Sequence, residues 1–432
     1  MTPVSVLLIS FLMLLLVNAP IAFVIGGSGI FWFLSKGSVP INIIVQRVVA
    51  QTQSISFMAV PFFILAGNLM NRTGITPRLM KFSQVVTRKM IGGTCQVSVL
   101  LSTLMGGVSG SAVADATMEA RILGPSMTKR GYPKGYSSGV LCLTSLITAT
   151  IPPSLGLILY GFVGNVSIGR LFIAGLIPGI LMCFALMFTV WLTSKRHGYD
   201  VPGPEVQSPK AGEILGSAKE CFFALIFPVL LIVLIRFGLC TSTEAGAFAV
   251  MYALFCGAVI YRELSFKGFM EALIDSVVDT GAIILIIAMS GIFSYALTSE
   301  QVPTVLGRHL LGLTDNPQLM MIIIIVFLTF TGMVIDSNVN ILLFTPLILP
   351  VLTQMSVNPV HFGIIMMTIV TMGCMTPPVG TACYSVCDIM GCSIGDYVKH
   401  SWPFFAAVIL LDMAMVFIPD VILFLPNLIY GG

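Results

Sequence analysis

Long apolar runs dominate this chain and limit what it can fold into. The sequence has 432 residues, of which 57% are hydrophobic. It contains about a dozen stretches that approach or exceed the roughly 20 residues needed to cross a hydrocarbon core. The chain is therefore predicted to be an all-α membrane protein with many crossings. The apolar runs lie near residues 4–34, 55–71, 94–124, 138–164, 170–194, 221–240, 243–261, 272–298, 318–353, 360–392 and 402–429.

The composition argues against several classes of function. Only 9% of the residues are charged, against about 25% in ordinary globular domains. The net charge is +3 and the Lys and Arg residues fall in loops, so no nucleic-acid partner is expected. The 10 cysteines form no CxxC pair and the 4 histidines show no ligand spacing, so a transition-metal or haem site is not expected either. The N-terminus lacks a basic n-region, which argues against a cleavable signal peptide.

Two Pro-Pro pairs inside apolar segments expose an internal repeat. Pro152-Pro153 recurs 225 positions later as Pro377-Pro378. Adjacent prolines cannot continue a helix, because each lacks an N–H and restricts the residue before it. Other residues match at this offset or within one position of it, which places repeat units at 55–195 and 280–420. The further matches are Gly107 with Gly332, Pro125 with Pro350, Pro178 with Pro403, Ser167-Ile168-Gly169 with Ser393-Ile394-Gly395, and Ala66-Gly67 with Ser290-Gly291.

Both units have the same internal plan. Each begins with a scaffold helix and a more polar arm, continues with a run interrupted by small and polar residues, and ends with a proline-broken helix and a closing helix. We interpret the interrupted runs as re-entrant hairpins. Whether residues 4–34 form one bent helix or two short ones stays open. The expected parts are N-terminal helices with an interfacial arm at 1–54, hairpins at 94–130 and 318–355, broken helices at 136–165 and 360–388, a connecting loop with scaffold helices at 196–279, and a C-terminal tail at 421–432.

The placement of basic residues predicts that the two units are inverted. Lys and Arg flank the first hairpin on both sides, for example Arg88 before it and Arg130 after it, so both of its ends are expected in the cytoplasm. The matching stretch before the second hairpin holds only Arg308 and His309. The second hairpin should therefore enter from the opposite face of the membrane.

Hairpins and broken helices at matching positions indicate an ion and substrate site near the midplane. Non-helical backbone at this depth is tolerated only where it is buried in protein or lines a cavity. Half-helix N-termini offer N–H groups to an anion, while unwound carbonyls can bind a cation. Oxygen-bearing side chains surround the four breaks and suit sodium better than a transition metal. They are Ser102, Thr103, Ser109, Ser111 and Asp115; Thr148, Thr150 and Ser154; Asp336, Ser337, Asn338 and Asn340; and Thr371, Thr376 and Thr381.

Simpler explanations stand beside this one. A hydroxyl in a membrane helix usually bonds back to its own helix or to a neighbouring helix. Asp115 could pair with Arg121 at the base of the first hairpin, whereas Asp336 has no close basic neighbour and is the stronger functional candidate. Arg47, in an amphipathic stretch, is expected to be an interfacial anchor, although it could face a partner.

Three motifs are informative in combination: GGVSGSAVADA (Gly106–Ala116), ATIPPSLGLILYG (Ala149–Gly161) and CMTPPVGTACYS (Cys374–Ser385). In this order and length they resemble the large membrane subunit of tripartite ATP-independent periplasmic (TRAP) transporters, the DctM/SiaM type. The resemblance covers nearly the whole chain. It implies an elevator-type transporter, distantly similar in fold to the divalent-anion/sodium symporters, in which scaffold helices hold a mobile transport domain of hairpins and broken helices.

The resemblance also implies partners, a coupling ion and site residues. The partners would be a separate small four-helix membrane subunit (DctQ/SiaQ type), a periplasmic solute-binding protein (DctP/SiaP type) and lipid of the bacterial inner membrane. Two or more Na⁺ ions would drive uptake of an organic acid. When the family's site positions are transferred to this sequence, the residues that would hold sodium are Ser102, Thr103, Gly107, Pro152, Gly332, Asn338, Gly373 and Thr376. Those that would hold substrate are Ser109, Ser111, Ser154, Asp336 and Thr381.

The family pattern does not fix the transported acid. No Lys or Arg lies within the breaks, so a monocarboxylate such as sialic acid is favoured slightly over a C4-dicarboxylate. A stand-alone sodium/dicarboxylate symporter and a passive channel are alternatives. An enzyme is not expected, because no intramembrane His or Lys could serve as a base for Ser111.

Overall fold

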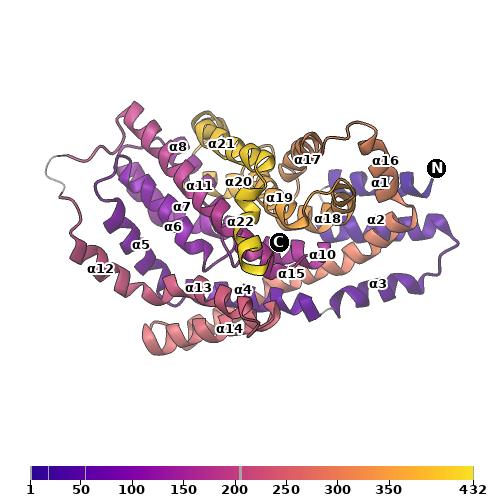
Figure 1. The fold of residues 1–432 in the computed structure, drawn as a ribbon, viewed down its shortest axis with the longest axis horizontal. Helices are drawn as coiled ribbons and strands as arrows, with labels where there is room; N and C mark the ends of the chain where they lie inside the picture. The colour runs from indigo at the N-terminus through magenta and orange to yellow at the C-terminus, as the bar shows by residue number, and fades with distance from the viewer. Residues whose placement is uncertain (1, 18, 54, 204–206, 432) are drawn as a thin grey trace.

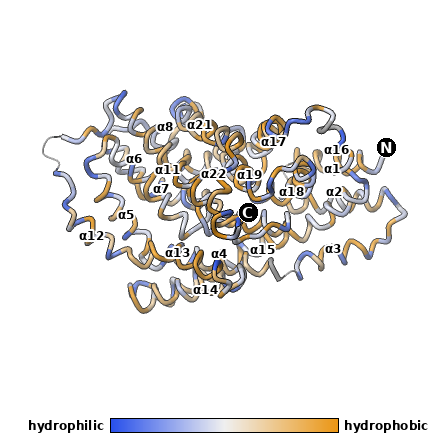
Figure 2. Tube along the Cα trace, viewed as in Figure 1, coloured by the Kyte–Doolittle hydropathy of each residue, from blue (hydrophilic) through white to orange (hydrophobic). Residues whose placement is uncertain are grey.

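The computed structural model describes residues 2–17, 19–53, 55–203 and 207–431, and within these ranges the regular structure is entirely helical. Five helices are long and apolar enough to cross a membrane by length and composition, and two helix pairs bent by 47° and 64° meet the same test when each is taken as one span. Figure 2 shows hydrophobic residues along nearly all of the long helices. The prediction of an all-α protein is thus confirmed for the described residues.

One group of helices forms an outer layer along the lower and right-hand parts of Figure 1. In it α2 packs between α1 and α15, while α4 packs against α14 and α15. Residues 4–34 form two helices, since Pro20 fixes its own φ and stands as the N-cap of α2. The helices of this layer are α1 (Pro3–Leu16), α2 (Ile21–Lys36), α3 (Asn42–Thr52), α4 (Ala59–Asn71), α13 (Phe222–Arg236), α14 (Ser242–Phe255) and α15 (Phe266–Ser299).

The hairpins and broken helices pack together into a second body. The half-helix α10 packs against α18 of the second hairpin, and α20 packs against α7 of the first hairpin. Each half-helix therefore lies beside the hairpin of the other half of the sequence. The helices of this body are α6 (Gly93–Gly106), α7 (Ala112–Lys129), α8 (Lys134–Thr144), α9 (Leu146–Thr150), α10 (Leu155–Gly164), α11 (Ile168–His197), α17 (Pro317–Gly332), α18 (Ser337–Gln354), α19 (Pro359–Cys374), α20 (Thr381–Met390) and α21 (Ile394–Phe417).

The two halves present these elements in the same order. Both ends of α18 lie 225 positions after the ends of α7, and α19 begins 225 positions after α8. This is the offset of the two Pro-Pro pairs. The inverted relation of the halves stays a prediction.

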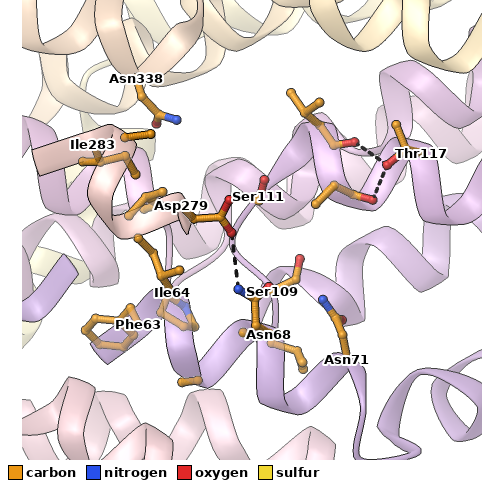
Figure 3. A pocket seen from close by; sticks show the side chains of 18 of the residues that line it. Phe63, Ile64, Asn68, Asn71, Ser109, Ser111, Thr117, Asp279, Ile283 and Asn338 are labelled. Carbon is orange, nitrogen blue, oxygen red and sulfur yellow. Dashed lines mark hydrogen bonds between the residues drawn. The ribbon is translucent and has the colours of Figure 1, made fainter. Parts of the chain in front are cut away.

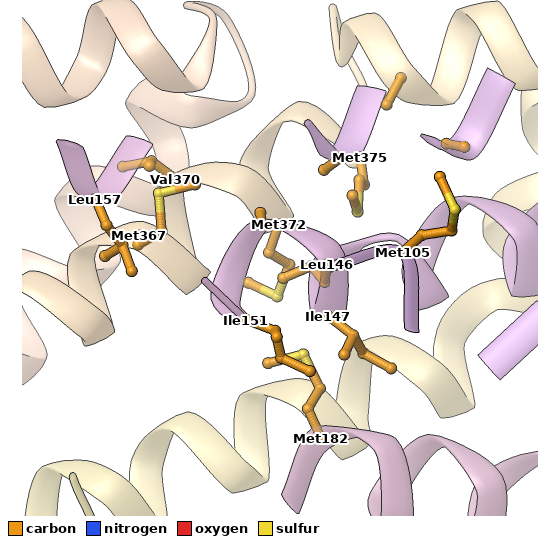
Figure 4. Packing of buried hydrophobic residues seen from close by; sticks show 14 of the residues in the cluster. Met105, Leu146, Ile147, Ile151, Leu157, Met182, Met367, Val370, Met372 and Met375 are labelled. Atoms are coloured by element: carbon orange, nitrogen blue, oxygen red, sulfur yellow. The ribbon is translucent and has the colours of Figure 1, made fainter. Parts of the chain in front are cut away.

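The first break is buried in protein, whereas the second is buried on its α19 side and exposed at Pro378 and Val379. Helix α9 contacts α19, and apolar side chains fill the space around both breaks (Figure 4). Ile151 before the first Pro-Pro is 7% exposed, and Met372 and Met375 before the second are 2% and 0% exposed. Methionine suits such an irregular space because its unbranched thioether adapts to the gaps left by non-helical backbone.

Connecting helices join the two bodies and close the chain. Helix α12 (Ala211–Glu220), in a segment expected to be mostly loop, pairs with α5 (Ile75–Thr87) through Lys81 and Glu220, whose Nζ and Oε2 atoms are 2.7 Å apart.

The expected tail at 421–432 is instead helix α22 (Asp420–Tyr430), which packs against α11. It is a separate element because the chain breaks at Ile418, before Pro419. Helix α16 (Val302–Leu311) follows α15.

Asp200 holds the base of the first hairpin together, where α6 begins and α7 ends. It lies in the loop after α11 and accepts hydrogen bonds from the Thr94 N–H at 2.9 Å, the Thr94 hydroxyl at 2.8 Å and Arg130 Nη1 at 2.8 Å. Burial alone would raise the pKa of Asp200, but these bonds outweigh it and hold the pKa below its ordinary value. The loop is thereby tied to both helices of the hairpin.

We expect Asp200→Asn to lower the free energy of unfolding at pH 7 by about 1–3 kcal/mol, because charged hydrogen bonds are lost. Because the pKa of Asp200 is lower in the folded state than in the unfolded state, its charged form stabilises the fold above the unfolded-state pKa of about 3.9. This stabilisation is lost as the pH falls through the folded-state pKa. The difference in the free energy of unfolding between the wild type and Asp200→Asn should therefore shrink below about pH 4. Thermal unfolding in detergent across this range checks the prediction, and a difference that is constant with pH would contradict it.

Candidate substrate and cation site

A cavity of about 460 Å³ separates the hairpin tips from the outer layer. Figure 3 shows Asp279 and Asn68 on the outer-layer side, with Ser109 and Ser111 close by on the first hairpin. Asn68 Nδ2 donates to Asp279 Oδ2 at 3.3 Å and to Ser276 Oγ at 3.0 Å. The cavity is thus bounded by helices α4 and α15 on one side and by both hairpins on the other.

The tip of the first hairpin presses against the first Pro-Pro break. Gly110 has φ +64°, and a methyl group there would lie 2.3 Å from the Pro153 carbonyl oxygen, so only glycine fits. Ser109 Oγ is buried without a hydrogen-bond partner. Ser111 is the N-cap of α7 but its side chain makes no capping bond. The first N–H groups of α7 are therefore left for another acceptor, such as an anion.

The tip of the second hairpin contributes a carboxylate. Asp336 is the N-cap of α18, and its Oδ1 accepts a bond from the Asn338 N–H at 2.9 Å. Both residues line the main cavity and an adjoining cavity of about 220 Å³, which also contains Ser111 and Thr381. Four of the five expected substrate residues (Ser109, Ser111, Asp336 and Thr381) thus line two neighbouring cavities.

Ser154 is placed differently from the expectation. It is fully buried, and its hydroxyl accepts a bond from the Leu157 N–H as the N-cap of α10. It lines neither cavity, although its neighbours Pro153 and Leu155 line the main one. The position before a half-helix favours a capping serine, and this use of the hydroxyl explains the difference.

The expected sodium residues fall into four kinds of position. Thr103 and Thr376 donate to carbonyls of their own helices, Val99 O at 2.7 Å and Met372 O at 2.8 Å, as in the simpler explanation. Ser102 donates to Glu119 Oε1 at 2.9 Å. Asn338 alone of these eight residues lines the main cavity.

The four remaining sodium residues lie in backbone breaks or close contacts. Gly332 and Gly373 touch, since a methyl group on Gly373 would lie 2.5 Å from the Gly332 Cα. Gly107 caps α6 beside Pro228, and Pro152 lies in the first break. The structure therefore joins the second hairpin tip to the second break. Sodium at these positions stays a prediction.

Several polar residues at or near the site are not among those predicted from the sequence. Asn68, Asn71 and Asp279 lie on outer-layer helices, away from the breaks where the sequence predicts a site, and no motif marks them.

Glu119 is fully buried and does not line the cavity. Its spacing of four from Asp115 puts both carboxyls on one face of α7, and this signal was available. Asp115 bonds Thr148 at 2.5 Å, and no contact with Arg121 occurs among the described ion pairs.

The main cavity contains negative but no positive side chains. Among the described residues that line it, Asp279 and Asp336 are the ionisable ones, and none is Lys, Arg or His. An anion entering this space would meet two carboxylates. It would need helix N-termini and a bound cation to be held there.

The chain is similar over nearly its whole length to known permeases. The family profile described as "Tripartite ATP-independent periplasmic transporter, DctM component" matches residues 8–421. The sialic acid TRAP transporter large permease protein SiaM of Vibrio cholerae is 33% identical and aligns over 97% of each chain. The 2,3-diketo-L-gulonate TRAP transporter large permease protein YiaN of Escherichia coli is 32% identical over 94% of this chain and 95% of its own. The crystal structure of the Alcanivorax borkumensis YdaH transporter, 12% identical, has a similar fold with a TM-score of 0.63 over 87% of each chain.

Proposed function

The chain belongs to the DctM family of tripartite ATP-independent periplasmic transporters, and we propose that this multi-pass large permease subunit imports an organic acid together with sodium ions across the bacterial inner membrane. A transport role, rather than an enzymatic one, follows from the family. Sodium coupling, the transported acid and the way in which the protein moves are our proposals.

The charge of the main cavity is the observation that carries this proposal. A carboxylate substrate cannot be stable beside Asp279 and Asp336 without compensating positive charge. The uncapped N-terminus of α7 supplies part of that charge. Sodium bound near the hairpin tips would supply the rest, so each ligand would raise the affinity of the other.

An elevator movement is supported by the division into two bodies. The hairpins and broken helices pack on one another, and the cavity lies between them and the outer layer. One cavity residue, Asn71, is next to Arg72 in the basic stretch expected in the cytoplasm. We therefore propose that the structure represents the state that releases substrate to the cytoplasm.

The proposed substrate is a sugar acid such as sialic acid. The two named relatives are permeases for sialic acid and for 2,3-diketo-L-gulonate, so a sugar acid is favoured over a C4-dicarboxylate. The proposed partners are a separate small membrane subunit and a periplasmic binding protein. The alternative of a stand-alone symporter predicts uptake by this chain without either partner.

Uptake of labelled sialic acid by proteoliposomes containing both membrane subunits and the binding protein tests the proposal. We expect uptake only with an inward sodium gradient, and a drop of at least about tenfold when potassium replaces sodium, since an uncompensated anion would meet two carboxylates. Full uptake in sodium-free buffer would contradict sodium coupling. Uptake without the binding protein would favour the stand-alone symporter.

A further inference from the structure

A separate cavity of about 600 Å³ lies on the body formed by the hairpins and broken helices. It sits where α7 of the first hairpin, the start of α8 and the end of α20 pack together. None of the described residues that line it lines the main or the adjoining cavity. The proposed transport site therefore does not use it.

The charged side chains of this cavity are positive. Among the described residues that line it, Arg121, Lys129 and Lys134 are the ionisable ones, and none is Asp or Glu. All three are exposed, and none of them forms an ion pair with a described residue. Arg130, which follows directly, is by contrast paired with Asp200 at 2.8 Å. Because like charges repel each other, three cations without acidic partners at one cavity favour an anion there.

Helix packing brings the lining residues together. Arg121 and Gly124 are three residues apart and hence lie on one face of α7. Glycine at position 124 lets α20 approach, since a methyl group there would lie 2.3 Å from Met390 Sδ. Lys134 Nζ donates to the Gly391 carbonyl oxygen at 3.3 Å, where a cation stabilises the C-terminal end of α20. Lys134 thus has a structural partner, and the other two cations are left for a ligand.

The cavity is expected at the level of the lipid headgroups. The tip of the first hairpin, where α7 begins, is predicted near the midplane of the membrane. With a rise of about 1.5 Å per residue, Arg121 lies about 14 Å and Lys129 about 26 Å from Ala112 along the helix. The hydrocarbon core extends about 15 Å from the midplane. On a helix close to the membrane normal, Arg121 thus reaches the edge of this core, and Lys129 lies beyond it on the side predicted to be cytoplasmic.

Apolar side chains lie beside the basic ones. Ile389 and Met390 line the cavity, and Met390 is, like Arg121, nine residues from the start of its helix. Ile122, next to Arg121, is 41% exposed. Asp388, one residue before Ile389, does not line the cavity. The cavity therefore offers an apolar wall at the depth of Arg121 and basic groups further out, which matches an amphipathic ligand.

The second half of the sequence lacks these charges. The positions 225 residues after the three cations hold Pro346, Gln354 and Pro359. A feature of the repeated transport machinery should recur in both halves, whereas this one occurs only beside the hairpin predicted to enter from the cytoplasm. Positive residues on that side also set the orientation of a membrane protein. Orientation depends on their number near the membrane, however, and gives no reason for three of them to line one cavity.

We propose that this cavity binds the headgroup of an anionic phospholipid from the cytoplasmic leaflet, with Arg121 and Lys129 in contact with its phosphate. Both side chains are common phosphate ligands, and basic pockets between membrane helices on the cytoplasmic side suit such headgroups. The apolar wall and the depth of Arg121 favour a lipid over a soluble anion, because acyl chains would lie beside Ile122. The inference goes beyond the proposed transport of an organic acid and does not depend on sodium.

Native mass spectrometry of the purified protein in detergent, titrated with lipid, tests this site. We expect phosphatidylglycerol to bind more tightly than phosphatidylethanolamine with the same acyl chains, since only the former has a net negative charge. Each basic side chain near an anionic headgroup contributes about fivefold in affinity. The variant Arg121→Gln/Lys129→Gln should therefore bind phosphatidylglycerol about 25-fold more weakly, with little change for phosphatidylethanolamine.

The matched control is Lys210→Gln/Lys219→Gln. It removes the same charge from exposed residues that are predicted on the same side of the membrane but do not line the cavity, so it should bind as the wild type does. A second variant, Arg121→Lys/Lys129→Arg, keeps both charges and should keep the preference for phosphatidylglycerol. Because the replaced cavity residues are exposed, the melting temperature should change little in any of these variants.

Three results would overturn the inference. The first is an affinity for phosphatidylglycerol that is unchanged in Arg121→Gln/Lys129→Gln. The second is an equal loss of affinity in the control variant, which would show attraction to the whole basic surface rather than to this cavity. The third is displacement of the bound lipid by millimolar inorganic phosphate, which would assign the cavity to a soluble anion. We expect the lipid to stay bound in phosphate.

Discussion

Replacing Gly373 by alanine is expected to reduce uptake at least tenfold. A methyl group at this position would lie 2.5 Å from the Gly332 Cα and 2.6 Å from the Gly332 carbonyl carbon. These are backbone atoms, so no side-chain rotation can relieve the clash. Overpacking of this kind costs about 1–3 kcal/mol, and here it would move the tip of the second hairpin away from the second break. Uptake by the reconstituted complex measures the effect.

The control for this variant is Gly216→Ala. Gly216 is also helical, but an added methyl group there would have no neighbour within 4 Å. We expect normal uptake from it. The Gly373 variant should still elute as a monodisperse peak, because the clash is confined to one contact. Normal uptake with alanine at Gly373 would show that the hairpin and the break need not touch during transport.

The breaks and hairpins could be predicted because proline and glycine act locally. Pro152-Pro153 and Pro377-Pro378 interrupt their segments whatever surrounds them, and the described helices end or begin at these points. The hairpin tips follow in the same way from runs of small residues. The main cavity therefore contains the expected Ser109, Ser111, Asp336 and Asn338.

The use made of each side chain could not be predicted in this way. Ser154 caps the half-helix α10 and Asp336 caps the hairpin helix α18, yet only Asp336 also reaches a cavity. Asn68 and Asp279 belong to the site because α4 and α15 pack beside the hairpin tip. That packing depends on residues far apart in the sequence. Local patterns thus predict where the backbone opens, and tertiary packing decides which oxygens face the opening.

Replacing Asp336 by asparagine is expected to lower uptake by about 10- to 100-fold. Interactions with a charged group contribute about 1.5–3 kcal/mol, and each 1.4 kcal/mol corresponds to a tenfold change in binding. Asparagine caps a helix as well as aspartate does, so the bond to the Asn338 N–H should be kept. The variant therefore removes the charge of the cavity residue while preserving the structure of the second hairpin.

Two measurements separate the charge of Asp336 from its capping role. If the charge helps to bind a coupled cation, Asp336→Asn should raise the sodium concentration needed for half-maximal uptake and leave the melting temperature unchanged. If Asp336 serves only as the cap of α18, the asparagine variant should transport normally. Asp420→Asn, which neutralises an exposed carboxylate at the start of α22, is the control and should behave as the wild type.

Since Asp279 lies on the outer layer, it would stay behind when the hairpins move. Asp336 is then the one described carboxylate of the main cavity that could accompany the substrate.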